Sequence, residues 1–129
     1  MLKAKGARKV MPLPVSVPSH CDLMKPAAEK LALELNSVKF NPAKIPLIQN
    51  VNGEIASDIH AIKEGLVKQL YSPVLWTKSV ATLAQNDVMT IVECGPGKVL
   101  SGLNKRIHES AKLFNLNSAE SMTALQASL

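Results

Sequence analysis

Apolar residues recur at helical spacing along much of the chain. Over residues 22–36 they stand at i, i+3, i+4, i+7 and i+11, which predicts a helix with the apolar stripe Met24, Ala27, Ala28, Leu31 and Leu35. Ser19 and Asp22 have the spacing of a capping box at its start, and Pro26 is tolerated because it lies near the first turn. The pattern therefore places a first helix shortly after His20.

Four further helices are predicted downstream. Ser57 or Asp58 caps the second, which ends before Pro73 and carries Ile59, Ile62, Leu66 and Leu70 on one face. Ser72 and Pro73 open the third as N-cap and first helical residue. A fourth follows the "GPGK" turn at residues 95–98, with the apolar positions Leu100, Leu103 and Ile107, and residues 118–129 form a short last helix.

Short apolar runs predict strands at residues 11–18, 44–51, 88–94 and 112–117. Prolines make the first an edge or terminal strand, and residues 88–94, apolar on both sides, suit a buried parallel sheet. The alternating order predicts an α/β fold with a mainly parallel sheet. The first strand has no evident partner, so the chain reads as though it begins in the middle of a larger fold.

Composition narrows the function classes. The chain has 129 residues, 47% of them hydrophobic, which suits one domain or a piece of a larger one. Aromatic residues are only 3%, too few for a platform that stacks nucleic-acid bases. Cys21 and Cys94 lie far apart without metal-ligand spacing, and no apolar run approaches the roughly 20 residues that span a bilayer. We expect a soluble cytoplasmic protein without a disulfide or zinc site.

The net charge of +5 is concentrated near the start, in Lys3, Lys5, Arg8 and Lys9. Such a patch suits an acidic partner, although charge alone favours the simpler explanation, a solvated helix end.

His20 is the first candidate for chemistry. It stands where the first predicted strand gives way to a helix, and the helix macrodipole there favours a neutral ring that can accept a proton. The alternative is an exposed histidine at a helix start. His60 and His108 lie among polar neighbours and are expected on the surface. Gln69 falls in the last turn of a helix, where its free main-chain carbonyl could accept a histidine ring N–H or bond to water.

The other motifs are weaker indications of function. The "ECGPGKVLSG" loop at residues 93–102 lacks the spacing of a phosphate-binding loop, so a tight turn is expected, with Lys98 free to approach an anion at the helix start. The chain contains no serine in a G-x-S-x-G elbow, and neither cysteine has a context that activates its thiol. A self-contained hydrolase or transferase would lack its nucleophile.

Three motifs in one order change this picture: "PLPVSVPSH" ending at His20, "QLYSPVLWTKSV" at residues 69–80 and "ECGPGKVLSGLNKRI" at residues 93–107. Together they resemble the C-terminal part of malonyl-CoA:acyl-carrier-protein transacylases of type II fatty-acid synthesis. The resemblance runs from about residue 5 to about residue 110. It implies that residues 17–129 are the C-terminal part of a large α/β-hydrolase-like, parallel-sheet acyltransferase subdomain. Residues 1–16 would be the end of a small ferredoxin-like subdomain.

The resemblance also implies residue roles. His20 matches the catalytic general base, and Gln69 matches the residue whose main-chain carbonyl orients it. Arg8, Lys9, Lys105 and Arg106 match basic positions that dock the acyl carrier protein. Malonyl-CoA and the carrier protein would be the partners, with neither nucleic acid nor membrane; the coenzyme A thioester would be a substrate rather than a cofactor.

The family's nucleophilic serine, its malonyl-binding arginine and its oxyanion hole have no counterpart in this sequence, so we expect the chain alone to be inactive. Ser19 precedes His20 at a position that helps choose the acyl group in related polyketide acyltransferases, which leaves a different acyl specificity open. A non-enzymatic module that keeps only the carrier-protein face is the other alternative.

Overall fold

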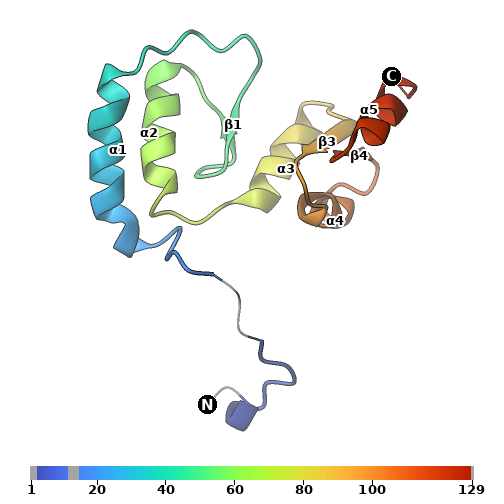
Figure 1. Ribbon diagram of the computed structural model, residues 1–129, viewed down its shortest axis with the longest axis horizontal. Coiled ribbons are helices and arrows are strands. Elements are labelled where there is room, and N and C mark those ends of the chain that lie inside the picture. The colour runs from blue at the N-terminus through green and yellow to red at the C-terminus, as the bar shows by residue number, and fades with distance from the viewer. Residues whose placement is uncertain (1–2, 12–14, 129) are drawn as a thin grey trace.

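A computed structural model describes residues 3–11 and 15–128 of the chain (Figure 1). In chain order the elements are η1 (Lys3–Lys5), η2 (Asp22–Met24), α1 (Lys25–Ser37), β1 (Ile48–Gln49), β2 (Glu54–Ile55), α2 (Ile59–Gln69), α3 (Trp76–Gln85), β3 (Thr90–Cys94), α4 (Val99–Ile107), β4 (Lys112–Leu116) and α5 (Ala119–Gln126). Five α-helices therefore appear in the described part, close to where the apolar spacing predicts them. No helix within these residues is both long and apolar enough to cross a membrane.

Helices α1 and α2 lie side by side (Figure 1). Ala28 of α1 and Ile62 of α2 are buried. The ammonium group of Lys63 donates to the carbonyl of Leu35 at 2.6 Å, so α2 also caps the end of α1. The start of α2 is the one predicted from sequence: Asp58 Oδ1 accepts from the backbone N–H of Ala61 at 2.8 Å.

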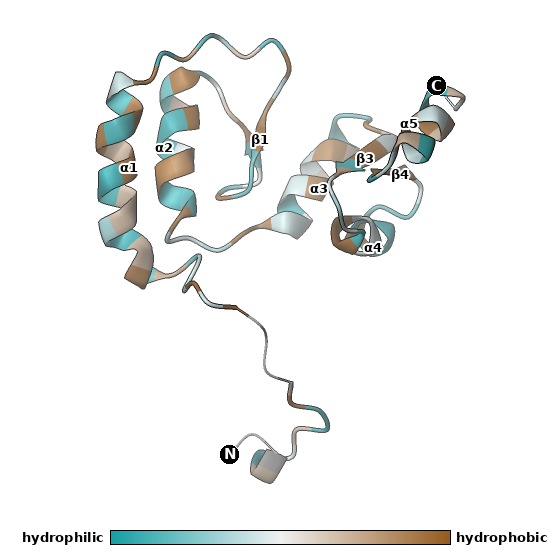
Figure 2. Ribbon diagram, viewed as in Figure 1, coloured by the Kyte–Doolittle hydropathy of each residue, from teal (hydrophilic) through white to brown (hydrophobic). Residues whose placement is uncertain are grey.

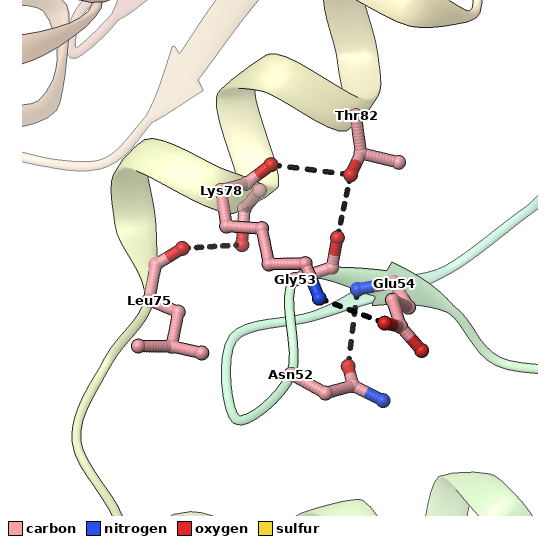
Figure 3. Close-up of polar contacts among 7 residues, drawn as sticks. Asn52, Gly53, Glu54, Leu75, Lys78 and Thr82 are labelled. Carbon is pink, nitrogen blue, oxygen red and sulfur yellow. Dashed lines mark hydrogen bonds and ion pairs between the residues drawn. The ribbon is translucent and has the colours of Figure 1, made fainter.

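A small antiparallel hairpin, β1–β2, connects the helix pair to α3. Figure 3 shows the contacts: the Thr82 hydroxyl donates to the carbonyl of Gly53 at 2.6 Å, and the Lys78 ammonium pairs with the Glu54 carboxylate at 2.7 Å. Gly53 adopts φ +67° in the turn, as the Asn52–Gly53 signal suggests. These bonds fix the hairpin to α3.

The C-terminal part is a β3–α4–β4 unit followed by α5. Strands β3 and β4 are parallel, with Thr90 opposite Lys112 and Cys94 opposite Leu116. The Trp76 indole N–H of α3 donates to the Asn104 side-chain oxygen of α4 at 2.9 Å, and Asn104 is only 2% exposed. This buried bond joins α3 to the parallel unit.

The fold is open. Its accessible surface is 9906 Å², whereas a compact monomer of this mass exposes about 6,700 Å². Figure 2 shows apolar colouring on α4 and on the stretch that leads from α2 into α3, where Val74, Leu75, Val99, Leu100 and Leu103 are exposed. Much apolar surface that a complete domain would bury is uncovered.

Three predictions about elements are wrong. The run at residues 44–51 yields only the two residues of β1, paired antiparallel, so the described residues form one parallel and one antiparallel pair rather than a mainly parallel sheet. Helix α3 begins at Trp76 rather than at Ser72, because the Leu75 N–H bonds to the carbonyl of Asn50. Ser19 does not cap the first helix: Cys21 stands at the N-cap of η2 without a side-chain bond.

Two further expectations concern the start of the chain and a histidine. The predicted strand at 11–18 includes residues 12–14, which lie outside the described residues, and its described flanks are not in a strand. His108 is buried rather than on the surface, at 9% exposure. Its Nε2 lies 3.2 Å from the carbonyl of Val88, because the end of α4 packs against the turn before β3. His60 is exposed, as expected.

Candidate active-site half around His20

His20 lies between residues 15–18, which form neither helix nor strand, and the η2 turn, and its backbone is in the left-handed region at φ +64°. A residue other than glycine rarely adopts this conformation, which requires compensation from its surroundings. The His20 N–H supplies it by donating to the carbonyl of Leu70 at 2.9 Å, just beyond α2. The main chain of His20 is therefore attached to the end of α2.

The imidazole ring makes a second attachment to the same helix end. His20 Nδ1 lies 2.8 Å from the main-chain carbonyl oxygen of Gln69. At this distance the ring donates its Nδ1–H, since two lone pairs would repel each other. In the neutral form of the ring, a proton on Nδ1 leaves Nε2 as an acceptor, and the side chain is exposed. The structure brings His20 and Gln69 together in the way that the free carbonyl at a helix end suggests.

The Gln69 side chain folds back over the turn that follows α2. Its Nε2 donates to the carbonyl of Ser72 at 3.1 Å and of Pro73 at 3.3 Å, and lies 3.4 Å from His20 Nδ1. The side-chain oxygen of Gln69 is buried and has no partner among the described residues. Sequence reasoning missed these side-chain contacts, because no residue spacing signals a glutamine that binds carbonyls three and four residues ahead.

The other predicted site residues are dispersed. Ser19 is exposed beside His20, and its N–H donates to the carbonyl of Val17 at 2.8 Å. Lys105 and Arg106 lie exposed in the last turn of α4. Figure 1 shows the segment of residues 3–11, which contains Arg8 and Lys9, well apart from α4. These four basic residues do not form one continuous surface in this structure.

The N-terminus of α4 already has a negatively charged partner, the side chain of Glu93 in β3. The Glu93 carboxylate accepts from the backbone N–H groups of Leu100 and Ser101 and from the Ser101 hydroxyl, at 3.2, 2.7 and 2.6 Å. The Ser101 hydroxyl bond is the main reason that the pKa of Glu93 lies below its ordinary value. The N-terminus of α4 is thus occupied by a side chain rather than open to a phosphate. The sequence analysis missed this role of Glu93.

No hydroxyl or thiol is placed against His20 Nε2 by any contact of the described residues, and no group of three side chains there could hold a metal ion. A cavity of about 710 Å³ is lined by residues 42–47, 55–60 and 62, around His60 rather than His20. The arrangement can hold a ring in one tautomer with a free Nε2.

The chain is similar to solved acyltransferase structures. A malonyl-CoA:acyl carrier protein transacylase from Xanthomonas oryzae superposes with a TM-score of 0.91 at 41% identity, covering 98% of this chain and 40% of that one. An acyl carrier protein S-malonyltransferase from Vibrio cholerae gives 0.86 at 47% identity, covering 95% and 40%. A complex of a type II polyketide acyl carrier protein with its malonyl-transacylase gives 0.87 at 45%, covering 97% and 41%. The chain is thus a mixed α/β segment of an acyltransferase fold.

Curated relatives make the identification more specific. The Escherichia coli K12 malonyl CoA-acyl carrier protein transacylase is 51% identical over 122 residues, which is 95% of this chain and 40% of that enzyme. The Bacillus subtilis enzyme is 42% identical over 122 residues, 95% and 38% of the two lengths. No family model matches the chain. This protein is therefore homologous to a segment of the malonyl-CoA:acyl carrier protein transacylases and spans about 40% of their length.

Proposed function

We propose that this chain is the histidine-bearing, C-terminal segment of a malonyl-CoA:acyl carrier protein transacylase that works in the cytoplasm. The proposal rests above all on the 2.8 Å contact between His20 Nδ1 and the Gln69 carbonyl. Residues 17–129 would belong to the large α/β-hydrolase-like subdomain, and residues 1–16 to the end of the small ferredoxin-like one. The large exposed apolar surface supports this proposal, because the remaining part of a transacylase would cover it.

In this mechanism His20 is the general base, and the Gln69 carbonyl holds its proton on Nδ1. His20 Nε2 takes the proton of a serine hydroxyl as that oxygen attacks the malonyl thioester, and then returns a proton to the departing coenzyme A thiolate. In the second half-reaction Nε2 takes the proton of the carrier-protein thiol as its sulfur attacks the malonyl-serine ester, and then gives a proton to the departing serine oxygen. The serine comes from a segment outside this sequence.

The carrier protein is the proposed acceptor. One of the similar structures is a complex between a malonyl-transacylase and its acyl carrier protein, which makes such a partner reasonable for this chain. Lys105 and Arg106 lie exposed at the end of α4 and would attract an acidic partner. Arg8 and Lys9 would join them only if the segment of residues 3–11 takes a different position in the complete enzyme. Ser19, exposed next to His20, would face the acyl group.

A chimera tests the proposal. The corresponding 40% of the Escherichia coli transacylase is replaced by this chain, and malonyl transfer from malonyl-CoA to its carrier protein is measured. We expect an active chimera, and a loss of about 10²- to 10⁴-fold in kcat/KM for His20→Ala. His20→Asn is the matched control for the backbone, since asparagine adopts the left-handed region readily and should keep the fold while losing activity. If the folded chimera keeps its kcat/KM with either substitution, His20 is not the general base.

The isolated chain gives a second test. Incubated with labelled malonyl-CoA, it should form no stable oxygen ester, because a general base without its nucleophile has no hydroxyl to activate. Mass spectrometry of the intact chain checks this. A malonyl ester on a serine of this chain would refute the assignment of the nucleophile to another segment.

A further inference from the structure

Gln69 presents two different groups to one ring nitrogen. Its main-chain carbonyl oxygen lies 2.8 Å from His20 Nδ1, and its side-chain Nε2 lies 3.4 Å from the same atom. The carbonyl can bond only to a protonated Nδ1, whereas the amide can bond only to an unprotonated Nδ1. One residue therefore offers partners for both tautomers of the ring, and only one of them leaves Nε2 free to act as a base.

The amide is diverted from the ring by the turn after α2. Its N–H groups point to the carbonyls of Ser72 and Pro73, at 3.1 and 3.3 Å. Both distances are shorter than the 3.4 Å to Nδ1. The two carbonyl oxygens can accept the amide N–H groups, whereas Nδ1 carries a proton and cannot. These carbonyls are available because α3 begins only at Trp76. The 3.4 Å approach to Nδ1 is thus a packing contact between two donors.

The orientation of the amide follows from the same carbonyls. Exchanging its oxygen and nitrogen would set the oxygen against two carbonyl oxygens and lose both bonds. In the observed orientation the Gln69 side-chain oxygen is buried without a partner among the described residues, which costs free energy. The two bonds that the amide nitrogen donates offset this cost. The side chain is therefore ordered by the 72–73 turn.

We propose that the Gln69 side chain is a positioning residue: by donating to the carbonyls of Ser72 and Pro73 it ties the turn that follows its own main-chain carbonyl, and so holds that carbonyl against the Nδ1–H of His20. The inference rests on the proposed function for its catalytic consequence, but the tautomer can be measured without any activity. It differs from the role of the Gln69 carbonyl, which every residue type at position 69 would supply.

The test begins with the 129-residue chain, labelled with ¹⁵N at histidine. Ring ¹⁵N spectra distinguish a protonated from an unprotonated Nδ1 for His20. In the unsubstituted chain we expect the proton on Nδ1. Gln69→Met keeps the length but loses both bonds to the turn, so the main-chain carbonyl of residue 69 is held less firmly against the ring. The ratio of Nδ1–H to Nε2–H tautomer should fall, by at most about 10-fold, the effect of one ordinary hydrogen bond. Gln85→Met, at the exposed end of α3, is the matched control and should leave it unchanged.

Gln69→Glu separates the loosening of the 72–73 turn from the choice of tautomer. Its carboxylate cannot donate to the carbonyls of Ser72 and Pro73, yet it can accept the Nδ1–H, so the tautomer should persist while the turn loosens. Looser structure is read as faster amide exchange at residues 70–72. This variant also serves if circular dichroism shows that Gln69→Met unfolds the chain. A His20 tautomer that is the same in the unsubstituted chain and in Gln69→Met, both folded, would overturn the proposal.

Kinetics of the chimera complete the test. Gln69→Met should lower kcat by the same factor as the measured fraction of Nδ1–H rings, a loss smaller than about 10-fold because that tautomer is the major one in the unsubstituted chain. KM should change little, because substrate contacts are untouched. An unchanged kcat, with His20→Ala inactive, would refute the positioning role and leave the proposed function standing. If the unsubstituted chimera is inactive but its His20 still has the Nδ1–H tautomer, the proposed function is refuted and the positioning role of Gln69 stands.

Discussion

Gly53 provides a sharp test of the packing between the β1–β2 hairpin and α3. The residue is buried at φ +67°, and a Cβ atom built on it would lie 2.7 Å from both Cβ and Cγ of Lys78. Alanine in the left-handed region is disfavoured by about 1–2 kcal/mol. Forcing an extra carbon against the stem of Lys78 adds about 1–3 kcal/mol, because these atoms lie close to the α3 backbone. Gly53→Ala should therefore lower the free energy of unfolding by about 2–5 kcal/mol.

Two further variants separate the contributions. Asparagine tolerates the left-handed region, so Gly53→Asn should show mainly the packing loss of about 1–3 kcal/mol. Gly102 lies within α4 with no atom inside 4 Å of a built Cβ. Gly102→Ala should thus stabilise the protein by roughly 0.5–1 kcal/mol through helix propensity alone.

Equilibrium urea unfolding, followed by far-ultraviolet circular dichroism, measures all three variants against the unsubstituted protein. The order of stability should be Gly102→Ala, unsubstituted, Gly53→Asn and Gly53→Ala. If Gly53→Ala unfolds at the same urea concentration as the unsubstituted protein, with an unchanged slope, the contact between hairpin and helix described above is not present in solution.

Two more outcomes follow from buried or capped polar groups. Trp76→Phe leaves the side-chain oxygen of Asn104 buried without its donor, and should cost about 1–3 kcal/mol in the same urea assay. The Glu93 carboxyl has a lowered pKa in the folded state, so its contribution is fully present above the ordinary value of 4.5 and is lost as the pH falls through the lowered one. Urea midpoints should accordingly fall more on acidification for the unsubstituted protein than for Glu93→Gln; equal slopes would contradict the Glu93 cap.

Local sequence signals predicted most of the helices, because their causes are local. The Asp58 cap and the turn at Gly53 depend on residues within three positions, and both are present. The start of α3 was predicted wrongly for a long-range reason: the Leu75 N–H bonds to Asn50, a partner 25 positions earlier. Ser72 and Pro73, a good helix start by propensity, instead offer their carbonyls to Gln69. Tertiary hydrogen bonds outweighed local preference there.

The candidate site shows the same division. A free carbonyl at the end of α2 could be anticipated at Gln69, and the structure puts His20 Nδ1 against it. The left-handed backbone of His20 could not be anticipated, because the Leu70 carbonyl that compensates it lies 50 positions later. His108 was expected at the surface for its polar neighbours, whereas the carbonyl of Val88 draws it under the turn before β3.

The acceptor that holds His20 is a peptide carbonyl, and this has a consequence for acid tolerance. An aspartate in the same place would take up a proton as the solution is acidified and would then lose its charge. A peptide oxygen has no such equilibrium in water of ordinary pH, and no substitution of the Gln69 side chain removes it. The anchor of the ring is thus insensitive to acidity, and its strength depends on how firmly the end of α2 and the turn after it hold the carbonyl in place.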